Sequence, residues 1–444
     1  MEEEKLLARA KEPERLAMRY HPFYRGKLAT SLKAPIRTYE DLSIWYTPGV
    51  AGPCKAICKD EGKVFEYTNK GNFVAIVSDG SRVLGLGDIG PEAALPVMEG
   101  KAMIFKYLGG VDAFPICLDT KDPDEIITAV RWLAPTFGGI NLEDIAKPKC
   151  FYILERLREE LDIPVWHDDQ QGTALVTLSA LISALKVVGK RLEDVEIALI
   201  GAGAANISIA RYIMLAGANP DSIVMVDRGG ILHEGRTDLK DKEPVKWEMC
   251  RRTNKKGKRG GIREALKGAD VCIALSRSGP GVIKKEWISD MAEEAIVFAC
   301  ANPVPEIWPW EAKEAGARIV ATGRSDFPNQ VNNSLGFPAV FRGALDVGAR
   351  KITDEMCIAA SYAISEYTEE KGLSEEYIIP NMGEAEMYIR EAVAVGMKAI
   401  QQGVARMRKS PQELRESASS MIKNAHKVLK LHMEEGIISP LPPL

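Results

Sequence analysis

The stretch Pro164-Val-Trp-His-Asp-Asp-Gln-Gln-Gly-Thr173 decides how this chain is organised. A short apolar run passes through two adjacent acids, Asp168 and Asp169, into an apolar segment of helical length at residues 173–185. This order predicts a strand, a carboxylate-bearing turn and a long helix. Ligands gather at the carboxyl ends of strands in parallel α/β proteins. We therefore expect one α/β unit on each side of this stretch, with the two acids at the floor of a crevice between them.

The composition excludes several classes of protein. The chain has 444 residues, of which 46% are hydrophobic and 27% charged, as in soluble proteins of two or three domains. A net charge of −4 gives no electrostatic reason to expect nucleic acid or an anionic membrane as a partner. The amino terminus is acidic and lacks the apolar core of a signal peptide. Eight cysteines without a CxxC pair favour reduced thiols, so we expect a cytoplasmic protein.

The amino-terminal part of the chain contains an arm and a candidate catalytic phenol. Residues 1–40 are charged and helical in pattern, which is typical of a docking arm, of an oligomer contact or of a solvated terminal helix. Tyr46 precedes the turn Thr47-Pro48-Gly49. Its phenol can face a cleft, or it can pack beside Trp45.

Lys101 lies on an apolar face of a helix predicted from Pro91 to about Leu108. Its neighbours three and four positions away in both directions are apolar, and those positions share its face. Such a lysine either extends its amine to solvent or is desolvated. Desolvation lowers the pKa of an ammonium group, which would make Lys101 a usable base near neutral pH.

Two adjacent acids, Glu143 and Asp144, close a second predicted strand. Together with Asp168 and Asp169 they would place up to four carboxylates about one point, and Mg²⁺ or Mn²⁺ prefers such oxygen ligands. His167 has no second His or Cys at ligand spacing, so we expect it to be structural.

Two stretches compete for the dinucleotide site. Gly85-x-Gly87-x-x-Gly90 matches the fingerprint, but the acid that ends the next strand comes 34 residues on (119 − 85), not about 20, which favours a substrate loop. The strand 195–200 is followed by a glycine turn, a helix and a strand that ends at Asp227. That context predicts a Rossmann site, although Asn206 at the third position is expected to loosen the helix–strand packing. The expected cofactor-binding residues here are Gly201, Gly203, Ala204, Ala205, Asp227 and Arg228.

The rest of the chain continues the α/β rhythm. Strands are predicted at 271–276, 295–301 and 317–322, and the segment 236–260 is charge-dense without periodicity, which favours a surface excursion. The predicted fold class is α/β. We expect an N-terminal α/β substrate and metal domain at 1–160, a Rossmann-type parallel-sheet domain at 161–390 and C-terminal helices at 391–444.

Five motifs in order give the chain a resemblance to the malic enzymes, in their compact prokaryotic form, from about residue 20 to about 390. They are Tyr46-Thr-Pro-Gly-Val, Ser78-Asp-Gly-Ser-Arg-Val-Leu-Gly-Leu-Gly-Asp-Ile-Gly, Glu99-Gly-Lys-Ala, Glu143-Asp144 and His167-Asp-Asp-Gln-Gln-Gly-Thr.

The resemblance implies a role for each candidate residue. Metal ligands would be Glu143, Asp144 and Asp169. Lys101 would be the general base with Asp168 beside it, and Tyr46 the general acid. Substrate would be held by Arg82, Asn302 and Asn333, with Asn332 close by, and the cofactor would also meet Asn302 and Asn332.

The implied reaction is the metal-dependent oxidative decarboxylation of malate to pyruvate. Lys101 takes the hydroxyl proton, hydride passes to the nicotinamide, CO₂ leaves and Tyr46 protonates C3. Decarboxylation of oxaloacetate and a homodimer are also expected. Asp227 at the end of its strand favours NAD, whereas Arg228 could grip a 2′-phosphate, so NAD is expected to be preferred and NADP tolerated.

Two other classes of protein fit parts of the sequence. A Rossmann dehydrogenase without decarboxylation would not need four converging carboxylates. A silent nucleotide-sensing protein would bind NAD without turnover and would not need Lys101 on an apolar face.

Overall fold

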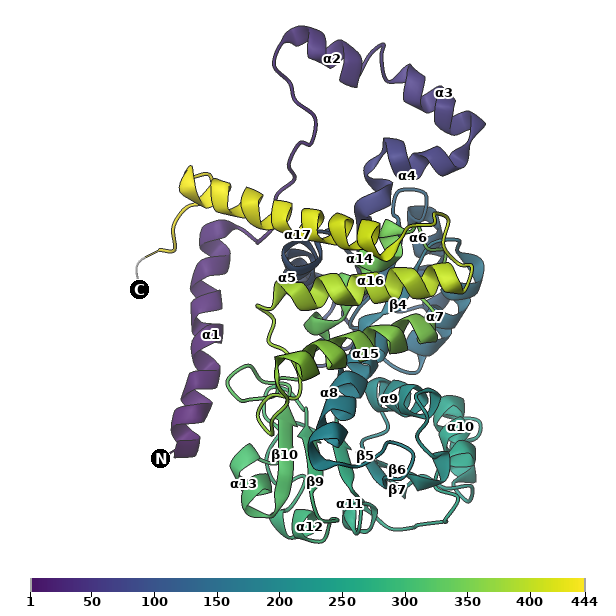
Figure 1. Ribbon diagram of the computed structural model, residues 1–444, viewed down its shortest axis with the longest axis vertical. Coiled ribbons are helices and arrows are strands. Elements are labelled where there is room, and N and C mark those ends of the chain that lie inside the picture. Colours follow the sequence, from purple (N-terminus) through teal and green to yellow (C-terminus); the bar gives the residue numbers. More distant parts are fainter. Residues whose placement is uncertain (1, 443–444) are drawn as a thin grey trace.

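The computed structural model describes residues 2–442, with side chains described from residue 12 onward, and contains two separate sheets (Figure 1). In the first sheet all neighbouring strands are parallel, in the order β2-β1-β3-β4. Its central strands are buried, as their apolar runs predict. The strands are β1 (Phe73–Ser78), β2 (Asp112–Cys117), β3 (Gly139–Leu142) and β4 (Val165–His167).

The second sheet has the order β10-β9-β8-β5-β6-β7, and only the β6–β7 pair is antiparallel. The unit β5–α9–β6 is the strand–helix–strand arrangement expected for a dinucleotide site. The strands are β5 (Ile197–Ile200), β6 (Ile223–Asp227), β7 (Gly230–Ile231), β8 (Val271–Ala274), β9 (Ala295–Ala299) and β10 (Ala317–Thr322). The α/β fold with two parallel sheets is therefore confirmed.

Helices cover both sheets. Those of the first half are α1 (Glu2–Tyr24), α2 (Tyr39–Trp45), α3 (Ala51–Lys59), α4 (Val64–Tyr67), α5 (Pro91–Gly109), α6 (Pro123–Leu133), α7 (Lys149–Glu160) and α8 (Thr173–Val188). Those of the second half are α9 (Ala204–Leu215), α10 (Pro244–Arg252), α11 (Ile262–Leu266), α12 (Lys285–Ser289), α13 (Pro309–Glu314), α14 (Phe337–Asp346), α15 (Asp354–Lys371), α16 (Ala385–Gln401) and α17 (Pro411–Glu434).

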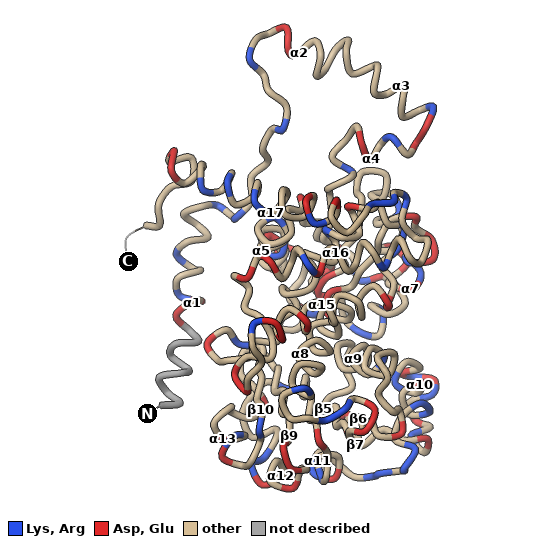
Figure 2. Tube along the Cα trace, viewed as in Figure 1, with Lys and Arg blue, Asp and Glu red and all other residues tan. Residues whose placement is uncertain are grey.

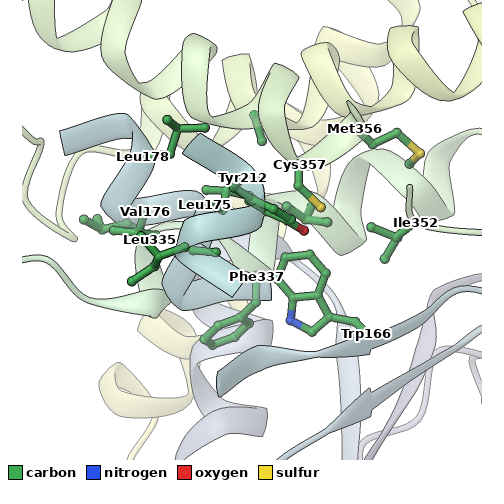
Figure 3. Packing of buried hydrophobic residues seen from close by; sticks show 14 of the residues in the cluster. Trp166, Leu175, Val176, Leu178, Tyr212, Leu335, Phe337, Ile352, Met356 and Cys357 are labelled. Carbon is green, nitrogen blue, oxygen red and sulfur yellow. The ribbon is translucent and has the colours of Figure 1, made fainter. Parts of the chain in front are cut away.

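Helix α8 runs through the centre of the molecule. Residues 174–185 are all buried, and Figure 3 shows side chains of α8 in one packed cluster with those of β4, α9, α14 and α15. Within the described residues, one helical stretch, 168–188, is long and apolar enough to cross a membrane, but 78% of that window is buried inside the protein. This stretch is a core helix.

The C-terminal helices return to the first sheet. Helices α14 and α17 pack on α5, and α14 also packs on α16. The backbones approach closely at two glycines: a Cβ on Gly109 would lie 2.6 Å from the carbonyl oxygen of Pro338, and one on Gly343 would lie 2.3 Å from that of Ala392. Helix α17 begins at the predicted capping box, in which the Ser410 side chain accepts from the Glu413 backbone N–H.

The change from one sheet to the other comes later than the predicted boundary at residue 161. Strand β4 pairs with β3, with Leu142 opposite His167, so residues 165–167 belong to the first sheet. The chain leaves this sheet through the π-helical turn η3 (Asp168–Gly172) and α8. Hydrophobic periodicity could not predict the domain boundary, because a strand of three residues is too short for its sequence to indicate which sheet it joins.

Helices α2 and α3 form an arm, residues 25–60, that projects from the body (Figure 1). No residue of α3 is buried, and Asp41 is the only buried residue of α2. At least half of each of five large apolar residues on this arm is exposed: Leu32, Ile36, Tyr39, Ile44 and Trp45. These exposed apolar side chains favour a docking arm or an oligomer contact for this part of the chain, whereas α1 is a terminal helix in which no described side chain is buried.

Candidate active site

Acids from two neighbouring strand ends converge. Because Leu142 and His167 are Cα partners in β3 and β4, the acids that follow them lie next to each other. The backbone N–H of Asp144 donates to Oδ2 of Asp169 at 2.9 Å. One carboxylate oxygen from each of Glu143, Asp144 and Asp169 lies within 4.8 Å of the others. The structure thus brings together the three residues expected to hold a divalent cation.

Lys101 projects from α5 into this group of acids. Its Nζ lies in contact with Oδ2 of Asp168, 3.1 Å from Oε1 of Glu143 and 4.4 Å from the centre of the Phe337 ring. Only 11% of its side chain is exposed. The amine is therefore desolvated and ion-paired, and it does not extend to solvent.

The pKa of Lys101 differs from the expectation. Burial by itself would lower it, but the charges of Asp168 and Glu143 outweigh burial and raise the pKa above its ordinary value. The apolar neighbours on the helix indicated only the effect of burial, whereas the charges of the acids that the fold places opposite the amine determine the direction of the pKa shift. In the ion-free protein Lys101 is an ammonium group.

The acids themselves are held at raised pKa values. Burial, with neighbouring carboxylates adding to it, raises the pKa of Glu143 well above its usual range and that of Asp144 to about 8. The pKa of Asp168 is raised by burial as well. Oδ2 of Asp144 is buried and has no hydrogen-bond partner in the described chain. Hard oxygen donors that repel one another and include an orphaned oxygen fit Mg²⁺ or Mn²⁺.

Local backbone and side-chain contacts fix the position of Asp168. Its Oδ1 accepts a hydrogen bond from Nε1 of Trp166 at 3.1 Å. A Cβ on Gly172 would lie 2.0 Å from the same oxygen, so any larger residue there would displace the carboxylate. Asp144 takes the left-handed conformation, with φ of 54°. The site therefore depends on the turns that follow β3 and β4.

His167 is buried beside the acids but lies outside the group of candidate ligands. Its Nδ1 is 3.7 Å from Oδ2 of Asp169, and neither ring nitrogen has a hydrogen-bond partner in the described residues. Burial lowers the pKa of the imidazole. A neutral ring packed behind Asp169 agrees with the structural role expected for His167.

The predicted substrate residues lie on loops around this centre. The Arg82 backbone N–H donates to the Asp144 carbonyl at 2.9 Å, and the Arg82 side chain is exposed. A Cβ on Gly85 would lie 3.1 Å from the carbonyl oxygen of Asn302, so the glycine-rich loop reaches the end of β9. The Asn333 Cβ would lie 3.3 Å from a Cβ on Gly172.

Asn332 has a structural contact that its sequence context did not predict. Its Oδ1 accepts hydrogen bonds from the backbone N–H and the hydroxyl of Ser334, and so caps the turn η6 (Asn333–Leu335). That carboxamide oxygen is therefore already engaged, which leaves Asn333 as the freer of the two amides.

The glycine turn after β5 is built for close backbone approach. Gly201 has φ of 99°, and its N–H donates to the carbonyl of Val226, the residue before Asp227. Gly203 precedes α9, whose first residues are Ala204 and Ala205. Asn206 does not loosen the packing, contrary to expectation, because its Nδ2 donates to the carbonyls of Ile200 and Gly201.

Asp227 is not a free carboxylate at the end of β6. It pairs with Arg236 at 3.1 Å and with Lys246 at 3.2 Å, while Arg228 is exposed. Sequence reasoning missed both cations because they belong to segment 236–260, which was expected to be a surface excursion. Part of that segment is α10, and Lys246 is buried. The apolar residues of α10, such as Met249, were the available signal.

Tyr46 is not brought to the acids in this chain. It follows Trp45, the last residue of α2, on the projecting arm, and 73% of it is exposed. The resemblance implied that Tyr46 is the general acid. Within the described chain its phenol lies on the arm, away from the acids.

Comparison with known proteins gives a consistent family. The model "Malic enzyme, N-terminal domain" matches residues 25–158, and "Malic enzyme, NAD binding domain" matches residues 170–401. The chain is 52% identical over 381 residues to the NAD-dependent malic enzyme of Geobacillus stearothermophilus, covering 86% of this chain and 78% of that protein. It is 43% identical over 397 residues to the NADP-dependent malic enzyme of Halomonas elongata, covering 86% and 92%. The crystal structure of Entamoeba histolytica malic enzyme superimposes with a TM-score of 0.97 at 49% identity, covering 100% of this chain and 93% of that one.

Proposed function

This chain belongs to the malic enzyme family, and we propose how its residues carry out the oxidative decarboxylation of malate with NAD(P). The observation that carries the assignment of roles is the meeting of Lys101 with the acids of β3 and β4. A simple dehydrogenase needs no such acid group, and a silent sensor needs no buried lysine within it.

The cation would be held by Glu143, Asp144 and Asp169. Their oxygens are within 4.8 Å of one another, and the raised pKa values of Glu143 and Asp144 reflect burial and repulsion that a divalent cation would relieve. When bound, Mg²⁺ or Mn²⁺ would polarise the C2 oxygen of malate and stabilise negative charge during loss of CO₂.

Lys101 is the general base in this proposal. Its Nζ is held by Asp168 and Glu143 from one side, with the Phe337 ring beside it, so its position is fixed before substrate arrives. Added positive charge among the acids would offset the effect that raises its pKa. A neutral Lys101 would then take the C2 hydroxyl proton, and bound NAD(P) would supply the acceptor for the hydride from C2. Asp168 orients the amine.

The substrate carboxylates would be bound by Arg82, Asn302 and Asn333. Arg82 is tied to the metal turn through its backbone, so its guanidinium can reach a carboxylate of a substrate bound at the acids. Asn302 follows β9 near Gly85, and Asn333 lies against η3, so both amides come from the second half of the chain and lie near turns of the first half. Malate would thus be held between the two sheets.

Tyr46 would be supplied by a second copy of the chain in a homodimer. The arm has an apolar surface, and residues 42–54 contain no charged side chain, as Figure 2 shows for the tan stretch from α2 into α3. Exposed apolar patches of this kind mark protein–protein contacts. A second copy that covers it would receive the Tyr46 phenol near its own Lys101, where it would protonate C3 of the enolate to give pyruvate.

Co-expression of two inactive variants tests the roles and the dimer together. Tyr46→Phe and Lys101→Ala are each expected to lose malate oxidation. In a mixed dimer with exchanged arms, one site receives both changes and the other receives neither. Random mixing should then restore about a quarter of the wild-type activity per subunit. If each site uses its own Tyr46, mixing restores nothing, and a monomer in solution would also contradict the proposal.

We extend the proposal to the decarboxylation of oxaloacetate. This reaction needs the cation and a proton donor for C3 but neither hydride transfer nor removal of a hydroxyl proton. Lys101→Ala should therefore lose far more malate oxidation than Mn²⁺-dependent oxaloacetate decarboxylation. Equal losses would mean that Lys101 serves both steps. The direct test of the main function is to supply malate, Mn²⁺ and NAD or NADP, and to follow reduced nicotinamide and CO₂ together.

A further inference from the structure

The carboxylate at the end of β6 already accepts hydrogen bonds from the protein's own donors. Oδ1 of Asp227 accepts from the Gly229 N–H at 2.8 Å and from Nη1 of Arg236 at 3.1 Å. Oδ2 accepts from Nζ of Lys246 at 3.2 Å. In a Rossmann fold this acid usually accepts hydrogen bonds from the adenosine ribose and, being negative, disfavours a 2′-phosphate.

The two cations are built into the fold. The Lys246 side chain is 8% exposed and that of Arg236 is 16% exposed. A Cβ on Gly229 would lie 2.7 Å from Nη2 of Arg236, so the guanidinium packs directly against the turn that follows Asp227. Packing against Gly229 therefore holds Arg236 at the Asp227 carboxylate, and burial holds Lys246 there.

The charges around this strand end do not leave a net negative centre. Arg236 also pairs with Asp238, and Lys246 also pairs with Glu243, which is itself 3.1 Å from Lys147 of the first half of the chain. Arg228, exposed beside them, makes no ion pair within the described residues. The cations of the group are Arg228, Arg236, Lys246 and Lys147, and the acids are Asp227, Asp238 and Glu243.

We propose that Lys246 and Arg236 are positioning residues that neutralise Asp227 and so admit NADP beside NAD, with Arg228 as the contact for the 2′-phosphate. The inference rests on the proposed use of NAD(P) and names the residues that set its cofactor range. With its charge balanced, Asp227 still has room to accept from a ribose hydroxyl but no longer repels a phosphate. Arg228, which makes no ion pair in the described residues, can donate two hydrogen bonds from its guanidinium to that phosphate.

Lys246→Met tests the inference because it removes the charge and keeps an apolar side chain of similar length. The ratio of kcat/KM for NADP to that for NAD is expected to fall about tenfold or more, since Asp227 then faces the phosphate with less compensation. Lys240→Met, the same change at an exposed lysine six positions earlier, should leave the ratio as in the wild type. A ratio unchanged in Lys246→Met overturns the inference.

A double variant separates charge from structure. Lys246→Met combined with Asp227→Asn should regain the wild-type ratio of kcat/KM for NADP to that for NAD, because no carboxylate is left to compensate. If the fold merely needs Lys246, the double variant stays as low as the single one for both cofactors, and the inference fails.

Binding of nucleotide fragments tests the phosphate contact without turnover. Arg228→Gln should weaken binding of 2′-AMP about tenfold in calorimetry and leave 5′-AMP binding close to that of the wild type. Equal effects on both nucleotides would remove Arg228 from the 2′-phosphate site. Because these measurements need no malate, they remain decisive even if wild-type protein fails to oxidise malate, a result that would overturn the proposed function alone.

Discussion

Two regions at the carboxyl ends of parallel strands have opposite charge balances. After β3 and β4, acids surround a single lysine, Lys101, and burial with mutual repulsion raises the pKa of Asp144 to about 8. After β6, cations surround Asp227, and Arg236, the Gly229 N–H and Lys246 outweigh burial and lower the pKa of its carboxyl. The same position in a parallel sheet therefore gathers acids in one domain and cations in the other. The neighbours of each carboxylate, and not its place in the fold, set the direction of its pKa shift.

The largest effect should come from removing an acid of the first region. Asp169→Ala is expected to abolish Mn²⁺-dependent turnover, because one of three anionic oxygens is lost and the other two cannot hold the ion alone. Calorimetry of Mn²⁺ binding measures this directly. Asp227→Asn is the matched control in the second region and should bind Mn²⁺ as the wild type does. Unchanged Mn²⁺ affinity in Asp169→Ala would contradict the assignment of a cation site to the first region.

The next largest effect concerns the lysine within the acids. Lys101→Ala should slow malate oxidation by about 10²–10⁴-fold, the usual contribution of a positioned base. Lys106→Ala serves as the control, since Lys106 is on the same helix but half exposed and paired with Asp112. Steady-state kcat with saturating malate and Mn²⁺ is the measurement. A near-normal kcat for Lys101→Ala would mean that the lysine only balances charge.

The next effect is that of pH on metal affinity, and it is expected to reach about tenfold per pH unit. An acid whose pKa is raised to about 8 is protonated below that pH in the ion-free protein, and the proton must leave before the oxygen binds Mn²⁺. The Mn²⁺ affinity should therefore rise with pH, by up to about tenfold per pH unit between 6 and 8 for one proton released. Calorimetry in buffers of different ionisation enthalpy counts the protons. NAD binding should not follow this trend, because the pKa of Asp227 is lowered. Metal affinity that is flat from pH 6 to 8 would contradict the raised pKa.

The smallest effect concerns a buried acid that belongs to neither region. Glu391 in α16 is fully buried, and neither carboxylate oxygen has a partner in the described chain. Burial raises its pKa well above the usual range, so the folded state retains a proton that the unfolded state releases. Stability should thus be lost as pH rises from the unfolded pKa towards the folded one.

Glu391→Gln removes this titration. The free energy of unfolding of the variant relative to the wild type should increase by about 1.4 kcal/mol per pH unit across that window. Urea unfolding of the metal-free proteins at pH 5.5, 6.5 and 7.5 gives the slope. A difference that does not change with pH would show that Glu391 is ionised in the folded protein. Burial would then not be sufficient to raise the pKa of a carboxyl in this fold, and the raised pKa values of the first region would need another cause.

Much of the fold and of the site was determined by local sequence. Strand β10 matches its prediction at residues 317–322, and α5, α8 and α17 begin at or near the predicted residues, because apolar periodicity and caps act over a few residues. The acids Glu143, Asp144 and Asp169 could be assigned to one point because a parallel sheet aligns the ends of its strands. The glycine turn at Gly201 was identified from its context of strand, helix, strand and terminal acid.

The tertiary structure alone decided the charge state of Lys101, the neutralisation of Asp227 and the separation of Tyr46 from the acids. Each depends on residues far apart in the sequence: Asp168 is 67 positions from Lys101, and Lys246 is 19 positions from Asp227. Electrostatic effects act through space and are strengthened by burial, and neither proximity nor burial is written in a local pattern. Local sequence therefore fixed which groups stand at the strand ends, and packing fixed what those groups can bind.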